Sequence, residues 1–158
     1  MMKLTDLLPG SMLIMNLESK DKKGTLRELI LKMVESGRIK DDDVRKVERL
    51  VQKRESQGST GIGKGLAIPH AKECAQVQDI VGVFARSRSG VPFDAVDGGL
   101  VHLVFLVVSP EGMADQHLAI MRKIATLHRD EKTLKFLTTN ESSESVLEIF
   151  KEVDDNFH

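Results

Sequence analysis

Among the residues that could do chemistry, His70 is the first candidate, because it directly follows Pro69 at the end of a short apolar segment. A neutral imidazole is a nucleophile near pH 7, and its phosphoramidate is reactive enough to pass a phosphoryl group on. A side chain at the end of a strand can also meet a partner protein. A surface histidine without a function is the simpler alternative, and it stays open at this point.

Two further residues could assist such a histidine. A transferring phosphoryl group needs a cation, and Arg54 is the natural candidate because a guanidinium fork matches two phosphoryl oxygens. His117 lies in the first turn of a predicted helix, where the helix dipole favours a neutral ring and a nearby anion. His117 shares one helix face with Met121, Ile124 and His128. From this spacing alone, an ordinary helix residue at the border of the core is the commoner explanation.

The segment 58–65, with sequence GSTGIGKG, offers loop donors near these residues. Ser59, Thr60 and free backbone amides could donate to a small anion, and glycines allow a close approach of the backbone. A nucleotide P-loop is disfavoured, because Gly65 stands where a magnesium-binding Ser or Thr belongs and a strand, not a helix, should follow. A flexible connector is the alternative for the loop taken alone.

Other reactive residues carry weaker signals. Cys74 is the only cysteine, so the chain cannot form an internal disulfide or a thiolate-rich zinc site. The histidines and carboxylates show no recognisable ligand spacing, and we therefore expect no metal site. His102 lies inside the most apolar segment, which favours a hydrogen-bonded core histidine without a role in chemistry.

Composition excludes several classes of function. Lys and Arg total 23 against 24 Asp and Glu, so no net field attracts nucleic acid or an anionic membrane. Trp and Tyr are absent, which removes most of the stacking surface that single-stranded nucleic acid requires. No apolar run of about 18 residues and no leader pattern is present. We expect a cytoplasmic protein that binds no nucleic acid and does not insert into membranes.

The elements that position the candidates follow from hydrophobic periodicity. Helices are expected over 25–36, 42–54, 113–128, 131–138 and 143–153, and strands over 12–17, 66–68, 80–86 and 101–108. The first helix should open with a Thr25–Glu28 capping box and stop at Gly37. Residues 57–65 should lack regular structure. The strand 101–108 is apolar almost throughout, as central strands are. The sequence predicts one domain over 1–158, an α/β fold with helices on both faces of a mixed sheet.

A longer motif then suggests a family. Arg54-Glu55 and the run from Gly58 to His70 resemble the phosphorylation-site signature of type 2 enzyme IIA domains of the bacterial sugar phosphotransferase system, in the fructose, mannitol and nitrogen-regulatory branch. The segments 4–8, 93–98 and 117–118 resemble other parts of the same family. The resemblance implies about five strands sandwiched by helices. It also implies phosphorylation of His70 on Nε2 by an HPr-like phosphocarrier, with His117 and Arg54 beside it and with Ser59 and Thr60 as secondary phosphate-binding residues.

The resemblance therefore implies a phosphotransferase that works through a phosphohistidine and needs no metal or other cofactor. A stand-alone, nitrogen-regulatory enzyme IIA acting on regulatory target proteins is the favoured interpretation. A sugar-specific enzyme IIA that donates to a fructose- or mannitol-type IIB domain is the second. A non-catalytic, anion-binding regulatory module is an alternative from another class, and a metal hydrolase is a poorer one.

Overall fold

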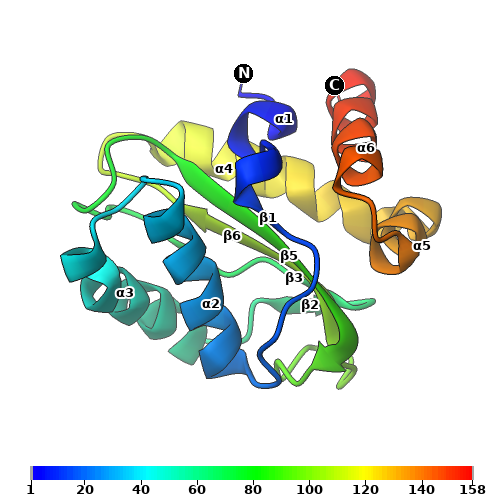
Figure 1. The fold of residues 1–158 in the computed structure, drawn as a ribbon, viewed down its shortest axis with the longest axis horizontal. Coiled ribbons are helices and arrows are strands. Elements are labelled where there is room, and N and C mark those ends of the chain that lie inside the picture. Colours follow the sequence, from blue (N-terminus) through cyan, green and yellow to red (C-terminus); the bar gives the residue numbers. More distant parts are fainter. Residues whose placement is uncertain (1, 158) are drawn as a thin grey trace.

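The protein is described by a computed structural model that covers residues 2–157 and contains one mixed β-sheet. The strands run in the order β1-β5-β6-β3-β2, and β4 also pairs with β6 (Figure 1). This confirms the predicted α/β fold with a mixed sheet. The strands are β1 (Leu13–Ile14), β2 (Gly61–Gly63), β3 (Leu66–Ala67), β4 (His70–Ala71), β5 (Val81–Val91) and β6 (Val101–Val108).

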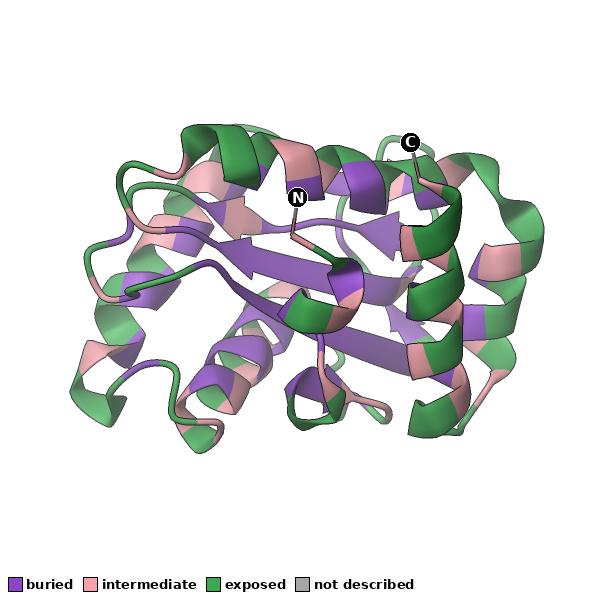
Figure 2. Cartoon of the chain, turned by 90° about the horizontal axis from the view of Figure 1, so that it is seen from above, coloured by how far each residue is buried: buried purple, intermediate pink, exposed green. Residues whose placement is uncertain are grey.

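Helices cover both faces of this sheet. One hydrophobic cluster joins α2 and α3 to the sheet, and a second joins α1, α4, α5 and α6 to the opposite face. Figure 2 shows the buried strands between these two layers. The helices are α1 (Leu4–Leu7), α2 (Lys22–Glu35), α3 (Val44–Ser56), α4 (Ala114–Ala125), α5 (Glu131–Thr139) and α6 (Ser143–Asn156), with 3-10 turns at Gly10–Met12, Asp41–Asp43 and Thr126–Arg129. None of the helices described here is long and apolar enough to cross a membrane.

Strand β6 lies at the centre of the sheet, as its apolar sequence predicts. It pairs antiparallel with β5 on one side and parallel with β3 and β4 on the other. Its side chains alternate between the two hydrophobic clusters, so that Val104 and Leu106 face one helical layer while Phe105 and Val107 face the other. The central strand β6 therefore positions the residues of β3 and β4, which pair with it.

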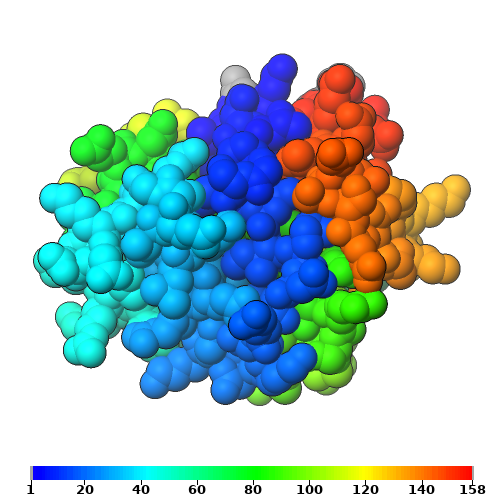
Figure 3. All heavy atoms as spheres, in the orientation of Figure 1, coloured from blue at the N-terminus to red at the C-terminus, as the bar shows by residue number. Residues whose placement is uncertain are grey.

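Helix α1 near the N-terminus packs against helix α6 near the C-terminus. The Asp154 carboxylate of α6 accepts hydrogen bonds from the Leu4 and Thr5 backbone amides at 2.6 and 3.1 Å, and it pairs with Lys123 of α4 at 3.0 Å. Figure 3 shows the N-terminal segment in blue near the C-terminal helix in red. A charged residue close to the C-terminus thus caps the first helix.

The predicted start of α2 is wrong. The helix begins at Lys22, and the Asp21 side chain caps it by accepting a hydrogen bond from the Gly24 amide at 2.6 Å. Thr25 lies one turn inside the helix and is fully buried, while Glu28 accepts from the backbone amides of residues 18 and 19. The predicted end is confirmed, because Gly37 follows the helix with a left-handed φ of 76°.

The glycine-rich segment is more regular than its composition predicts. Gly61–Gly63 forms strand β2 and pairs antiparallel with β3. Between the two strands, Lys64 and Gly65 have φ angles of 57° and 78°. Two successive positive φ angles are typical of the tight turn that joins a two-residue β-hairpin. The expectation of an irregular segment fails here because backbone pairing needs no side chains.

Candidate functional site

The pairing of β4 with β6 places His70 beside the C-terminal end of the central strand. His70 lies opposite Val107 in a parallel register. One residue beyond β6, Ser109 donates its backbone N–H to the Ala71 carbonyl at 3.0 Å. The chain then turns into α4 and brings His117 back over the strand ends. The ring centroids of His70 and His117 are 5.5 Å apart, with planes inclined by 57°.

The His70 ring has one nitrogen engaged and one free for chemistry. Its Nδ1 lies 2.9 Å from the Ile68 carbonyl oxygen. A carbonyl only accepts, so Nδ1 carries the proton and Nε2 keeps its lone pair. Burial is the main cause that lowers the pKa of His70 below its ordinary value of 6.5, and the positive charges of Arg54 and Lys72 lower it further. The hydrogen bond to the Ile68 carbonyl has the opposite effect and raises this pKa. His70 is therefore neutral at neutral pH, with a lone pair on Nε2.

The His117 ring is buried, with only 4% of its surface exposed. Its Nδ1 is hydrogen-bonded to the Ser109 hydroxyl, and its Nε2 is buried without a partner among residues 2–157. Burial lowers the pKa of His117 to about 4, and the neighbouring His70 and Lys72 contribute in the same direction. A neutral ring with one unsatisfied nitrogen thus stands beside His70, and such a group normally has a partner.

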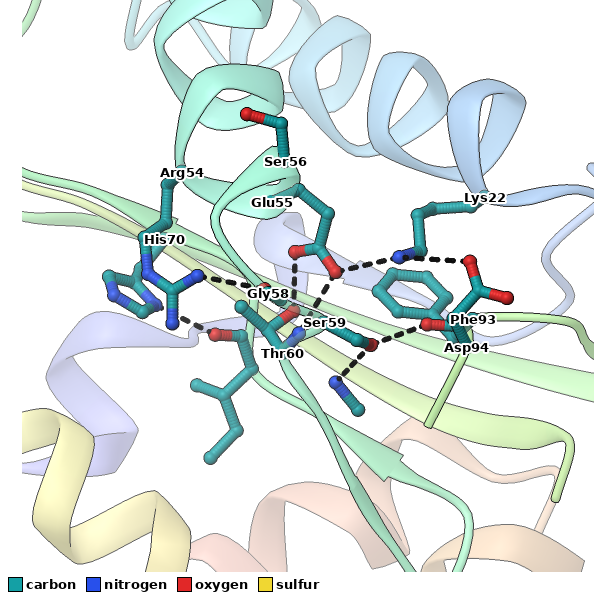
Figure 4. A network of polar contacts seen from close by, with 12 residues as sticks. Lys22, Arg54, Glu55, Ser56, Gly58, Ser59, Thr60, His70, Phe93 and Asp94 are labelled. Atoms are coloured by element: carbon teal, nitrogen blue, oxygen red, sulfur yellow. Dashed lines mark hydrogen bonds and ion pairs between the residues drawn. The ribbon is translucent and has the colours of Figure 1, made fainter. Parts of the chain in front are cut away.

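Arg54 brings a cation to the same place from the last turn of α3. One guanidinium nitrogen donates to the Gly58 carbonyl at 2.9 Å, which fixes the side chain over the loop. Arg54 and His70 line one cavity of about 300 Å³, together with Thr60, Arg122 of α4 and several apolar side chains. The labelled side chains in Figure 4 show both residues at the same side of the loop. The remaining guanidinium N–H groups are available to an anion in this cavity.

A buried carboxylate holds the loop between Arg54 and His70 in place. Glu55 is 8% exposed and accepts hydrogen bonds from the Thr60 amide at 2.9 Å, the Thr60 hydroxyl at 2.7 Å and Lys22 at 2.9 Å. The Ser59 hydroxyl donates to the Phe93 carbonyl and accepts from the Gly61 amide (Figure 4). Both loop hydroxyls are thus engaged within the protein, and their predicted role as phosphate ligands stays a prediction.

Sequence reasoning missed two residues of this arrangement, Glu55 and Ser109. Glu55 had a usable signal, because a carboxylate in the last turn of a helix opposes the helix dipole and needs a compensating partner. Ser109 had none, because a serine after a buried strand is common. Cys74 is buried, and among the described residues no group of three or more potential metal ligands gathers.

Known structures share this fold. Nitrogen regulatory protein IIA-Ntr from Neisseria meningitidis superposes with a TM-score of 0.84 at 33% sequence identity, over 93% of this chain and 98% of that one. The IIA mannitol protein in its complex with phosphorylated enzyme IIB from Escherichia coli superposes with a TM-score of 0.76 over 90% of this chain and 95% of that one, at 19% identity. The second likeness concerns the fold alone.

Sequence comparisons define the family. The family described as "Phosphoenolpyruvate-dependent sugar phosphotransferase system, EIIA 2" matches residues 6–153, and the chain belongs to it. A nitrogen regulatory protein of Bradyrhizobium diazoefficiens is 34% identical over 94% of both chains. The fructose-specific EIIABC component of Bacillus subtilis is 35% identical over 97% of this chain, which spans only 24% of that protein.

Proposed function

We propose that this chain is a histidine phosphoryl carrier that accepts a phosphoryl group on Nε2 of His70 from an HPr-like phosphocarrier. The observation that carries the proposal is the pair of neighbouring imidazoles, whose centroids lie 5.5 Å apart and whose unengaged nitrogens are both Nε2. His70 supplies the lone pair, and His117 supplies a buried group that lacks a partner until an anion arrives.

In the proposed transfer, the new bond forms between phosphorus and His70 Nε2 while the bond between phosphorus and the donor's imidazole breaks. The donor imidazole leaves with the bonding electron pair, and the proton of His70 stays on Nδ1, which donates it in a hydrogen bond to the Ile68 carbonyl. Arg54 offsets the charge of the phosphoryl oxygens, and His117 donates to one of them. The reaction exchanges one phosphoramidate for another, so these side chains need only position and stabilise the group.

Enzyme I, HPr and labelled phosphoenolpyruvate test this proposal directly. We expect one acid-labile label per chain in the wild type and none in His70→Ala. The matched control is His102→Ala, because His102 is also partly buried and also bonds a carbonyl, that of Ser87 at 2.9 Å. Label that persists in His70→Ala refutes the assignment. A wild type that takes no label favours the alternative of a non-catalytic anion-binding module.

The fate of the phosphoryl group distinguishes two roles within the family. The nitrogen regulatory relative from Bradyrhizobium matches the chain over 94% of both lengths, which supports a regulatory enzyme IIA whose phosphorylation state controls target proteins. The fructose-specific relative from Bacillus supports a sugar-specific enzyme IIA that donates to a IIB domain. Rapid transfer of label to a fructose-type IIB domain would decide for the second role, and retention of the label would decide for the first.

A further inference from the structure

We infer that Ser109 is a positioning residue which holds the His117 ring with its proton on Nε2, so that this nitrogen donates to the phosphoryl group. The inference rests on the proposed function and extends it to a residue that no motif includes. It follows from the way the Ser109 backbone, the Ser109 hydroxyl and the His117 ring are held.

The backbone of Ser109 is fixed on both sides by the segment that carries His70. Its N–H donates to the Ala71 carbonyl at 3.0 Å, and its carbonyl accepts from the Cys74 amide at 2.9 Å. Ser109 is 1% exposed, so its side chain has no access to bulk water. The hydroxyl oxygen is therefore held at a set position relative to His70, and the only hydrogen-bond partner of its side chain within residues 2–157 is His117 Nδ1.

Counting donors and acceptors decides where the protons lie. If Nδ1 carried the His117 proton, the Ser109 hydroxyl would accept, and its own proton and the Nε2 lone pair would both be buried without partners. If the hydroxyl donates to Nδ1, only the Nε2–H group is left over. An unsatisfied buried group costs about 1–3 kcal/mol, so the arrangement with one such group is favoured over that with two.

The remaining Nε2–H group is what the transfer needs. The low pKa of His117, about 4, keeps the ring neutral, so that one nitrogen donates and the other accepts. His70 is held in the opposite tautomer by the Ile68 carbonyl, with Nδ1 protonated and Nε2 bare. One imidazole thus presents a nucleophile and the other a donor, and two different oxygen atoms of the protein assign these roles.

The first test reads the tautomers directly by long-range ¹H–¹⁵N NMR of the labelled, unphosphorylated protein at pH 7.5. We expect a protonated Nε2 in wild-type His117 and a protonated Nδ1 in His70. In Ser109→Ala, the His117 ring should become a mixture of tautomers while the His70 ring is unchanged. A wild-type His117 ring protonated on Nδ1 overturns the inference, and this measurement requires no variant to fold.

The second test measures phosphoryl transfer from phospho-HPr. Ser109→Ala should lower the maximal rate about fivefold to tenfold, as expected from the loss of one buried hydrogen bond, with KM for phospho-HPr unchanged because Ser109 does not reach the surface. Ser109→Thr keeps the hydroxyl and should recover most of the rate. The matched control is Ser87→Ala, since Ser87 is also 1% exposed, and its hydroxyl accepts from the Gly90 amide and not from His70 or His117.

The outcomes separate this inference from the proposed function. If the wild type is labelled and Ser109→Ala equals Ser87→Ala in rate and in tautomer, Ser109 has no positioning role while the carrier function stands. If the wild type takes no label, the carrier function fails and the NMR spectrum still reports whether Ser109 sets the tautomer. A rise in KM with an unchanged maximal rate overturns the inference as well, because that pattern indicates altered docking.

Discussion

The buried His117 ring should make the stability of the protein depend on pH in a defined window. Burial holds its pKa at about 4 in the folded state, compared with 6.5 for a free side chain. At pH values between these two pKa values, His117 is protonated in the unfolded chain but not in the folded chain, so acidification favours unfolding. The stability that depends on a neutral His117 is fully present above pH 6.5 and is lost as the pH falls towards 4. The full difference corresponds to about 3 kcal/mol, and about 2 kcal/mol of it should be lost between pH 7.5 and 5.0.

Urea unfolding followed by circular dichroism at these two pH values measures the loss. The comparison protein is His117→Asn, whose amide can still bond the Ser109 hydroxyl but does not titrate. Between the two pH values, the free energy of unfolding of the wild type should fall by about 2 kcal/mol more than that of this variant. The pKa of His70 is also lowered by burial, but His70 is present in both proteins, so its effect cancels in the comparison. Equal losses within about 0.5 kcal/mol, near the error of extrapolation for a small domain, would refute the reasoning.

Three substitutions test other parts of the structure. Gly82→Ala should destabilise the protein by about 1–3 kcal/mol in urea unfolding, because a Cβ atom there would lie 2.5 Å from Leu7 Cγ. Glu55→Ala should cost about 3 kcal/mol in the same assay, since it leaves the Thr60 donors and a lysine without their buried partner. Arg54→Ala should slow labelling by phospho-HPr about 100-fold without a comparable loss of stability, because its guanidinium is needed only when an anion is bound.

Two of these substitutions have a matched control in the chain. Gly10→Ala adds a Cβ atom whose nearest contact is 3.9 Å away, so it should be nearly neutral. Lys53→Ala removes a neighbouring cation from the last turn of α3 and should not slow labelling. Equal effects of either control and its test variant would contradict the structural explanation. A loss below about 1 kcal/mol in Glu55→Ala would mean that the carboxylate does not hold the loop.

The fold could be predicted where a pattern is long enough to reflect burial. The apolar run 101–108 became the central strand, and α3 lies within two residues of its predicted bounds. Elements held by backbone pairing alone could not be predicted, because β2 and β4 contain three and two residues and owe their geometry to β3 and β6. Thr25 was misjudged because Asp21, a few residues earlier, offered an equally good cap.

In the candidate site, too, local sequence predicts some features, while others depend on the tertiary structure. His70 could be selected from its local motif, whereas the approach of His117 depends on a turn between β6 and α4 that the spacing does not encode. The resemblance to a family supplied that proximity, and the structure brings the two rings within 5.5 Å. Ser109 could not be assigned, because its importance lies in the buried partner that it meets. The position of Glu55 in the last turn of a helix indicates that it needs a partner, but which partners it meets depends on the tertiary structure.

The proposed difference in tautomer between His70 of β4 and His117 of α4 depends on how the sheet places its two oxygen partners. His70 lies in β4 and Ser109 directly follows β6, so the distance between the His70 ring and the Ser109 hydroxyl is set by the β4–β6 register. A slip of one residue in that register would turn His70 to the opposite face of the sheet, away from α4. The Glu55 carboxylate and the glycine hairpin hold the loop 57–60 in place. Arg54 donates a hydrogen bond to Gly58 of this loop. The sheet therefore fixes His70 relative to Ser109, and the junction of α3 with its loop independently positions the Arg54 guanidinium.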